Sequence, residues 1–280
     1  MEEWGILAAI GAALAWGTYM VPFKISKSER LVQFQALMAV GIFISGLCIS
    51  ILFGYSLSLN AYALVSGILW ASANAISLVA VTNLGISRAV PLMASLVILF
   101  SFLWGALIFD EIPSGMVMGF FGIGLIVVGV ILVSSSGNTQ SQNVKRGLLA
   151  GVLAGLIFGS QLVPLKISNL ATRDFFFSLC LGIFLTGLII ALSLKVKFKK
   201  EAIKESLLSG TIWNIGNLLS LISLSVIGLS KMGPISQSAT LIAVLWGLFY
   251  FKEITQPKKK LQVLVGATIL LLGIITLGLA

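Results

Sequence analysis

Apolar stretches of about 20 residues recur along the whole 280-residue chain, separated by short polar loops. A helix of that length crosses the ~30 Å hydrocarbon core of a bilayer. The composition agrees, because 58% of the residues are hydrophobic and only 10% are charged, too few charges to cover a water-soluble globule of this size. In lipid each backbone polar group must be satisfied within the protein, so these stretches are expected to be helices.

Ten spans are predicted, which gives an all-α polytopic membrane protein. Their approximate bounds are residues 4–22, 32–54, 61–82, 86–109, 115–135, 146–164, 175–194, 206–227, 232–251 and 261–279. The N-terminus has no basic leader, so the first span is expected to belong to the fold and not to a cleaved signal peptide.

The second half of the sequence repeats the first at an offset near 142 residues. WASANAISLVAVTNLGISRAVP, beginning at Trp70, returns as WNIGNLLSLISLSVIGLSKMGP at Trp213, and WGTYMVPFKIS at Trp16 returns as FGSQLVPLKIS at Phe158. We predict a first five-helix repeat over 1–135, a linker over 136–145 and a second five-helix repeat over 146–280. Because five is odd, the second repeat enters the membrane in the opposite sense, and inverted repeats are typical of secondary transporters.

The net charge of +9 indicates membrane topology and not nucleic-acid binding, since the basic residues lie in short loops between apolar spans. Fifteen of the eighteen lysines and arginines fall in, or within three residues of, the loops after spans one, three, five, seven and nine. That side is expected to be cytoplasmic, which places both termini outside the cytoplasm. The predicted location is the cell (plasma) membrane, with the lipid bilayer as a partner.

Spans one and six carry small residues at every fourth position, a pattern that favours close helix packing. These residues are Gly5, Ala9, Ala13 and Gly17 in one span and Gly147, Gly151, Gly155 and Gly159 in the other. A proline follows each stripe, Pro22 and Pro164, and removes a backbone donor. Each proline either breaks its helix beside a cavity or simply ends it.

Spans three and eight each carry a tryptophan, an asparagine and a serine at i, i+4 and i+7, on one helix face. An amide needs a partner in hydrocarbon, so these faces either bond neighbouring helices or bind a ligand. An aromatic plane beside an amide suits a sugar, whose hydroxyls both donate and accept. The candidate substrate-binding residues are Trp16, Thr18, Tyr19, Trp70, Asn74, Ser77, Ser160, Gln161, Trp213, Asn214, Asn217, Ser220 and Gln237.

Charged groups near the span ends are candidates for gating. Lys24 and Lys166 follow the two prolines on opposite membrane faces, where they either serve a gate or snorkel to the interface. Glu111 and Glu253 end spans four and nine, where pairing with a nearby lysine is favoured over ion coupling. Histidine is absent, and no metal-ligand, phosphate-loop or nucleophile motif is present. No enzyme activity, catalytic residue, metal or cofactor is therefore predicted.

The segments GILWASAN and GTIWNIGN, and the acids in FDEI and FKEI, resemble those of the glucose/ribose porter group of the drug/metabolite transporter superfamily, which takes up sugars. Asp110 and Lys252 depart from that superfamily's glycine-glutamate ending. The resemblance covers all ten spans and implies a central cavity and alternating access, often with a coupling ion.

A secondary carrier importing a neutral sugar is therefore expected, with a cation as a candidate coupling partner. An exporter of amino acids or of amphipathic metabolites or drugs is the alternative, and a membrane scaffold or sensor without transport is the third. A charged cavity wall would favour the exporter, and a core without a cavity would favour the scaffold.

Overall fold

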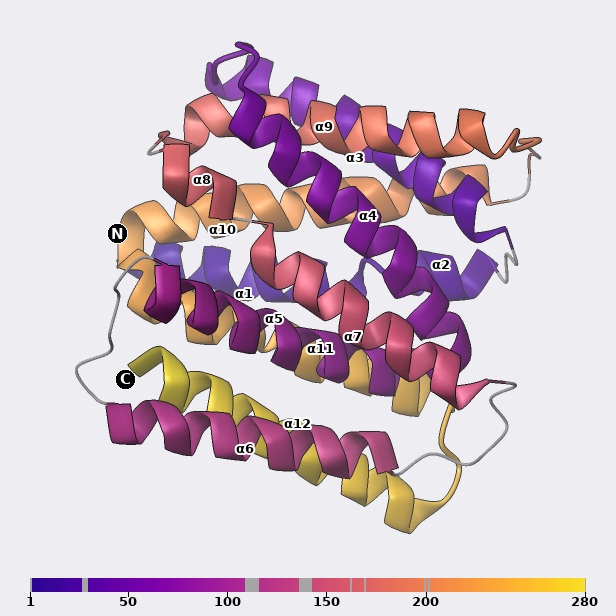
Figure 1. Ribbon diagram of the computed structural model, residues 1–280, viewed down its shortest axis with the longest axis vertical. Coiled ribbons are helices and arrows are strands. Elements are labelled where there is room, and N and C mark those ends of the chain that lie inside the picture. The colour runs from indigo at the N-terminus through magenta and orange to yellow at the C-terminus, as the bar shows by residue number, and fades with distance from the viewer. Residues whose placement is uncertain are drawn as a thin grey trace.

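The computed structural model describes residues 2–26, 30–108, 116–135, 143–161, 163–168, 170–198, 200 and 202–279, and all regular structure in these residues is helical (Figure 1). The elements are α1 (Glu2–Thr18), α2 (Val21–Ser26), α3 (Leu31–Phe53), α4 (Ala61–Leu84), α5 (Ile86–Ile108), α6 (Met116–Ser135), α7 (Val144–Ser160), α8 (Val163–Ser168), α9 (Thr172–Ser193), α10 (Ile203–Gln237), α11 (Ala239–Leu245), the π-helix η1 (Trp246–Tyr250) and α12 (Pro257–Leu279). The predicted linker lies mostly outside the described residues.

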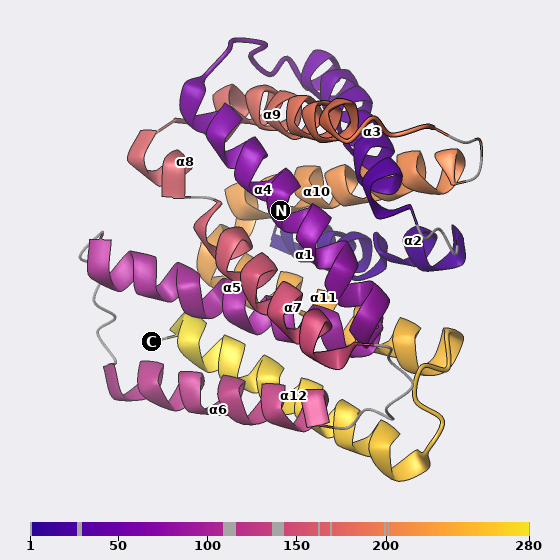
Figure 2. The same cartoon turned by 45° about the vertical axis from the view of Figure 1, so that its right-hand side comes forward.

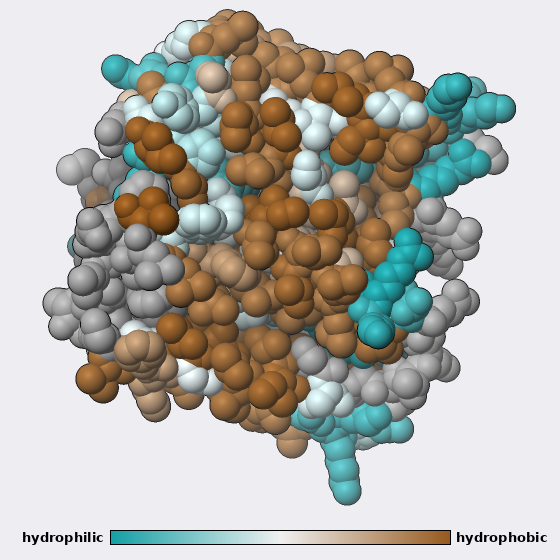
Figure 3. Space-filling view, in the orientation of Figure 1, coloured by the Kyte–Doolittle hydropathy of each residue, from teal (hydrophilic) through white to brown (hydrophobic). Residues whose placement is uncertain are grey.

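Six described stretches are long and apolar enough to cross a membrane: Glu2–Ser26, Leu31–Phe53, Ala61–Leu84, Val144–Ser168, Arg173–Ser193 and Pro257–Thr276. Three shorter apolar helices cover Ile86–Phe100, Val117–Val133 and Ala239–Tyr250. Apolar side chains cover the middle of the face in Figure 3, and hydrophilic ones gather at its right-hand edge. Soluble proteins rarely expose so wide an apolar surface, whereas membrane proteins place such a surface against lipid. The protein is an integral membrane protein.

The first and sixth spans are each broken into two helices near a proline. α1 ends at Thr18 and α2 begins at Val21, with Pro22 in its first turn. α7 ends at Ser160 and α8 begins at Val163, with Pro164 in its first turn. Proline fits the first turn of a helix because the N–H it lacks has no acceptor there. The breaks leave Tyr19 and Gln161 between helices.

The glycine stripes lie at helix contacts, as the sequence predicts. Gly17 faces α11 so closely that a Cβ there would lie 2.6 Å from Ile242 Cβ, and one on Gly159 would lie 2.8 Å from the Val97 carbonyl oxygen of α5. Both distances are shorter than van der Waals contact, so only glycine fits. The stripes bring α1 and α7 close to helices of the opposite half of the chain.

Helices from the two halves interleave, and their contacts come in matching pairs. α1 packs against α10 and α11, while α7 packs against α4 and α5. α3 packs against both α9 and α10, while α9 packs against both α3 and α4. α3 lies beside α9 and α6 beside α12 in both views (Figures 1 and 2). The core is therefore shared by the halves and does not divide into two separate bundles.

One predicted boundary is wrong. Predicted spans 206–227 and 232–251 are separate, but α10 continues as one helix from Ile203 to Gln237. In the first half α4 ends at Gly85, which has a φ of +82° that glycine readily adopts. α10 instead runs through Pro234, which helices in membrane proteins tolerate when neighbouring groups satisfy the freed carbonyl.

Candidate functional site

A central cavity of about 220 Å³ lies among helices of both halves. Its lining residues are Trp16, Tyr19, Trp70, Val90, Met93, Ala94, Val97, Phe158, Gln161, Trp213, Asn217, Ser236, Ala239 and Thr240. None of these described lining residues is charged. The volume is below the ~300–1,000 Å³ of pockets for drug-sized ligands, so the cavity suits a molecule smaller than those.

The two repeated tryptophans meet at this cavity. The ring centroids of Trp70 and Trp213 lie 4.0 Å apart with their planes at 44°. Phe158 adds a third ring, 5.9 Å from Trp70. Trp70 is 3% exposed and Trp213 is 7% exposed, so packing fixes both rings. Residues 143 positions apart in the sequence thus form one aromatic surface.

Two polar atoms at the cavity are buried without a hydrogen-bond partner in the described structure. They are the Nε1 donor of Trp16 and the Oε1 acceptor of Gln161. An unsatisfied buried polar atom costs about 1–3 kcal/mol. Native proteins rarely keep such atoms without a role, and a ligand hydroxyl satisfies a donor and an acceptor equally well.

The wall of the cavity is chemically uneven. The second half supplies polar side chains, which are Gln161, Asn217, Ser236 and Thr240. The helix α5 of the first half supplies only apolar ones, Val90, Met93, Ala94 and Val97. The sequence reasoning missed the residues from α5 and α11. Their spacing of i, i+3, i+4 and i+7 from Val90 to Val97 marks one helix face and was the available signal.

The asparagines divide between packing and the cavity. Asn74 is fully buried, and its Nδ2 donates to Gln35 Oε1 at 2.6 Å and to Met38 Sδ at 3.4 Å. Asn214 is also fully buried, and its Nδ2 donates to the Ile42 carbonyl at 3.2 Å and to Ser45 Oγ at 3.1 Å. Neither lines the cavity, so of the asparagines predicted to bind substrate only Asn217 reaches it.

The predicted hydroxyls bond within the protein. Ser77 Oγ donates to the Asn74 carbonyl and Ser220 Oγ to the Asn217 carbonyl, each at 2.7 Å. Neither serine is among the residues that line the cavity.

Thr18 and Ser160 each accept a hydrogen bond from a tryptophan of the other half, and these two tryptophans, Trp246 and Trp104, stand 142 positions apart in the repeated sequence. Trp246 Nε1 donates to Thr18 Oγ1 at 3.1 Å, and Trp104 Nε1 donates to Ser160 Oγ at 2.8 Å. Each bond joins one half of the chain to the broken helix of the other half. The Gln237 side chain lies outside the part of the chain that the structure describes.

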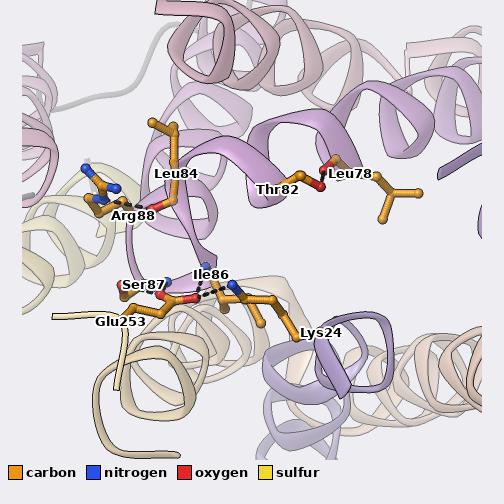
Figure 4. A network of polar contacts seen from close by, with 8 residues as sticks. All are labelled: Lys24, Leu78, Thr82, Leu84, Ile86, Ser87, Arg88 and Glu253. Carbon is orange, nitrogen blue, oxygen red and sulfur yellow. Dashed lines mark hydrogen bonds and ion pairs between the residues drawn. The ribbon is translucent and has the colours of Figure 1, made fainter. Parts of the chain in front are cut away.

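Glu253 forms a polar latch with Lys24 and the start of α5 (Figure 4). Its carboxylate lies 3.0 Å from Lys24 Nζ and accepts from the Ile86 and Ser87 amides at 2.8 and 2.9 Å. Ser87 Oγ donates a further bond of 2.6 Å. A carboxylate at a helix N-terminus gains from both the unpaired amides and the helix dipole.

Glycines make room for this carboxylate. A Cβ at Gly85 or at Gly247 would lie 2.6 Å from Glu253 side-chain atoms. The latch sits one helical turn from the cavity, because α5 begins at Ile86 and lines the cavity from Val90. Lys24 thus pairs with Glu253 and does not line the cavity. The sequence favoured this kind of pairing between Glu253 and a nearby lysine.

The residues that the repeat relates to Lys24 and Glu253 are only partly described. Lys166 lies in α8 and does not line the cavity, and Glu111 lies outside the described residues. Among the described residues no group of three His, Cys, Asp or Glu side chains is arranged to hold a metal ion.

Comparisons with known proteins identify a family and a shared fold. A family model described as "Sugar transport protein" matches residues 7–280. The "Glucose uptake protein GlcU" of Bacillus subtilis is 25% identical over 98% of each chain. A solved crystal structure covers 98% of this chain and 95% of its own length with a TM-score of 0.65 at 15% identity, which indicates a shared fold.

Proposed function

Because this chain belongs to the sugar transport protein family, we propose that it is a secondary carrier that imports a neutral sugar by alternating access to the central cavity. The supporting relative is a glucose uptake protein similar along its whole length. We also propose that this chain belongs to the glucose/ribose porter group of the drug/metabolite transporter superfamily.

The observation that carries the proposal is the chemistry of the cavity. An aromatic surface from Trp70 and Trp213 faces neutral hydrogen-bonding groups, including Gln161 and Asn217, with no charged lining residue among those described. The C–H face of a sugar ring packs on an indole, and its hydroxyls need neutral donors and acceptors. The exporter alternative has less support, since a zwitterionic amino acid requires compensating charge.

Alternating access rests on an inverted relation between the two halves. The matching helix contacts and the two cross-half bonds, Trp246 to Thr18 and Trp104 to Ser160, support this relation. Two halves with equivalent contacts can exchange conformations and open one site to either side. The latch of Glu253 and Lys24 then closes the basic, cytoplasmic side, and Lys166, at the equivalent position of the other half, serves the gate on the opposite side. Pro22 and Pro164 mark the helix breaks at which each gate bends.

Uptake by purified protein in liposomes tests the function. Radiolabelled glucose is expected to enter faster than in empty liposomes and to be competed by other neutral monosaccharides but not by amino acids. Repeating the assay with imposed proton and sodium gradients separates uniport from cation symport. A Trp213→Phe variant keeps an aromatic ring at this buried position, so it should remain folded and take up sugar more slowly. Failure to move any sugar, or competition by amino acids, would contradict the proposal.

A further inference from the structure

A basic basin lies at the membrane boundary, away from the central cavity. It has a volume of about 430 Å³ and is lined by Arg30, Leu31, Val32, Gln33, Val196 and Lys197. The adjoining segment 195–205 holds five lysines and two glutamates. The basin thus combines positive charge with aliphatic walls on the side predicted to be cytoplasmic.

The backbone holds the two basic residues of this basin together. α9 ends in a turn in which Lys195 has a φ of 49° and the Val196 amide donates to the Ala191 carbonyl at 2.9 Å. This helix-ending turn reverses the chain toward α3. The Lys197 carbonyl then accepts a bond of 3.1 Å from Arg30 Nη1. The residue before α3, Arg30, and the segment after α9 that carries Lys197 are therefore held side by side.

An apolar groove continues from the basin along the same two helices. Its cavity volume is about 70 Å³, and its walls include Ala36, Leu37 and Val40 of α3, Phe184 and Leu188 of α9, and Phe198. Phe198 directly follows Lys197, and Ala36 lies one turn beyond Val32. Phe198 is 52% exposed. The groove therefore leads from the charged boundary into the hydrocarbon region.

We propose that this α3–α9 seam binds an anionic phospholipid, with the headgroup phosphate between Arg30 and Lys197 and an acyl chain in the groove. Basic pockets between helices on the cytoplasmic face suit anionic headgroups, and guanidinium and ammonium groups both bind phosphate. A soluble phosphate would use the basin alone, whereas the adjoining groove favours a lipid. The site is independent of the sugar and of the central cavity.

Native mass spectrometry and thermal unfolding of the full-length protein in detergent test the site. Phosphatidylglycerol is expected to remain bound and to raise the Tm more than phosphatidylcholine with the same acyl chains. Lys197→Gln should weaken phosphatidylglycerol binding about five-fold, the typical effect of one basic residue near a membrane surface. Lys258→Gln, an exposed lysine at the start of α12, is the matched control and should bind as the wild type does.

A second pair of variants tests the groove. Val40→Phe fills it and should reduce binding while leaving the Tm without added lipid close to that of the wild type. Val128→Phe, at a lipid-facing position of α6, should have no effect on binding. Equal binding of the two lipids, equal loss in Lys258→Gln, or full competition by soluble glycerol phosphate would overturn the proposal.

Discussion

Asn74 and Asn217 occupy equivalent positions in the repeated sequence, yet their side chains meet different surroundings. Asn74 donates to Gln35 Oε1 in a fully buried contact between α4 and α3. Asn217 is partly exposed and lines the central cavity. The repeat predicted that both positions would be polar, but it contained no information on which side chain would find a partner within the protein.

Leucine substitutions should separate these two roles. Asn74→Leu leaves Gln35 without its buried partner, so it should lower stability by about 1–3 kcal/mol. Asn217→Leu should leave the Tm within a degree or two of the wild type, a change of roughly 0.5 kcal/mol or less. Only Asn217→Leu is expected to reduce sugar uptake in molecules that remain folded. Thermal unfolding and liposome uptake measure both effects, and equal transport loss per folded molecule in the two variants would contradict the assignment.

At the scale of elements, the N-terminus of α5 depends on a side chain from the other end of the sequence. Its first amides are bound by Glu253, 166 and 167 residues away, which also pairs with Lys24 of α2. The latch therefore connects the first broken helix, α5 and the segment after η1. Any movement that opens the cavity on the side of the latch must first break the charge-assisted contacts of the Glu253 carboxylate.

Glu253→Gln should favour the state open on the basic side. A cysteine introduced at Val90, in a background in which both Cys48 and Cys180 are replaced by serine, would report access to the cavity. Because bonds to a charged group contribute about 1.5–3 kcal/mol, labelling by an impermeant maleimide from the cytoplasmic side should accelerate about ten-fold or more. Glu205→Gln, at the start of α10 on the same side, is the control. Unchanged labelling in Glu253→Gln would show that the latch does not limit access.

Sequence patterns predicted most element bounds and a lysine partner for Glu253, but not its bonds to the start of α5. The predicted span 32–54 corresponds to α3, and the small-residue stripes lie at helix contacts as expected. Apolar length and small-residue spacing are local properties, so one sequence reveals them. The bond between Glu253 and Ile86 depends on how distant segments pack. The continuous α10 was missed for a similar reason, since neighbouring helices decide whether a proline ends a helix.

For the whole molecule, the distribution of charge predicts its orientation. Lysines 195, 197, 200 and 258–260 lie in the connections after α9 and η1 or at the start of α12. Figure 3 shows hydrophilic side chains along the right-hand edge, with a further group at the upper left. Both chain ends lie toward the opposite edge in Figure 1. The positive-inside rule then predicts that the basic edge is cytoplasmic and that both ends lie outside.

Epitope tags at the two termini test this orientation. Both tags should be cleaved by protease added to intact cells, because they lie outside the cytoplasm in the predicted topology. A tag inserted in the basic loop after α9 should be protected until the cells are permeabilised. Protection of either terminal tag in intact cells would contradict the orientation.

The candidate site was predictable in outline because its tryptophans are repeated in the sequence. Trp70 and Trp213 reach the cavity, whereas Ser77 and Asn214 are used in internal bonds. Residue type and helix face do not distinguish a side chain that lines the cavity from one that bonds within the protein. A buried hydroxyl or amide can bond the backbone of its own or a neighbouring helix. The apolar wall from α5 carries no chemical signal beyond helical spacing.

The contact between Trp70 and Trp213 also gives the protein an internal optical reporter. Two indole rings with centroids 4.0 Å apart are close enough for their electronic transitions to couple. Such a pair should contribute an exciton couplet to the circular dichroism spectrum, which either substitution to phenylalanine would abolish. A ligand that parts or tilts the rings would change the couplet, so occupancy of the cavity can be followed without any added label.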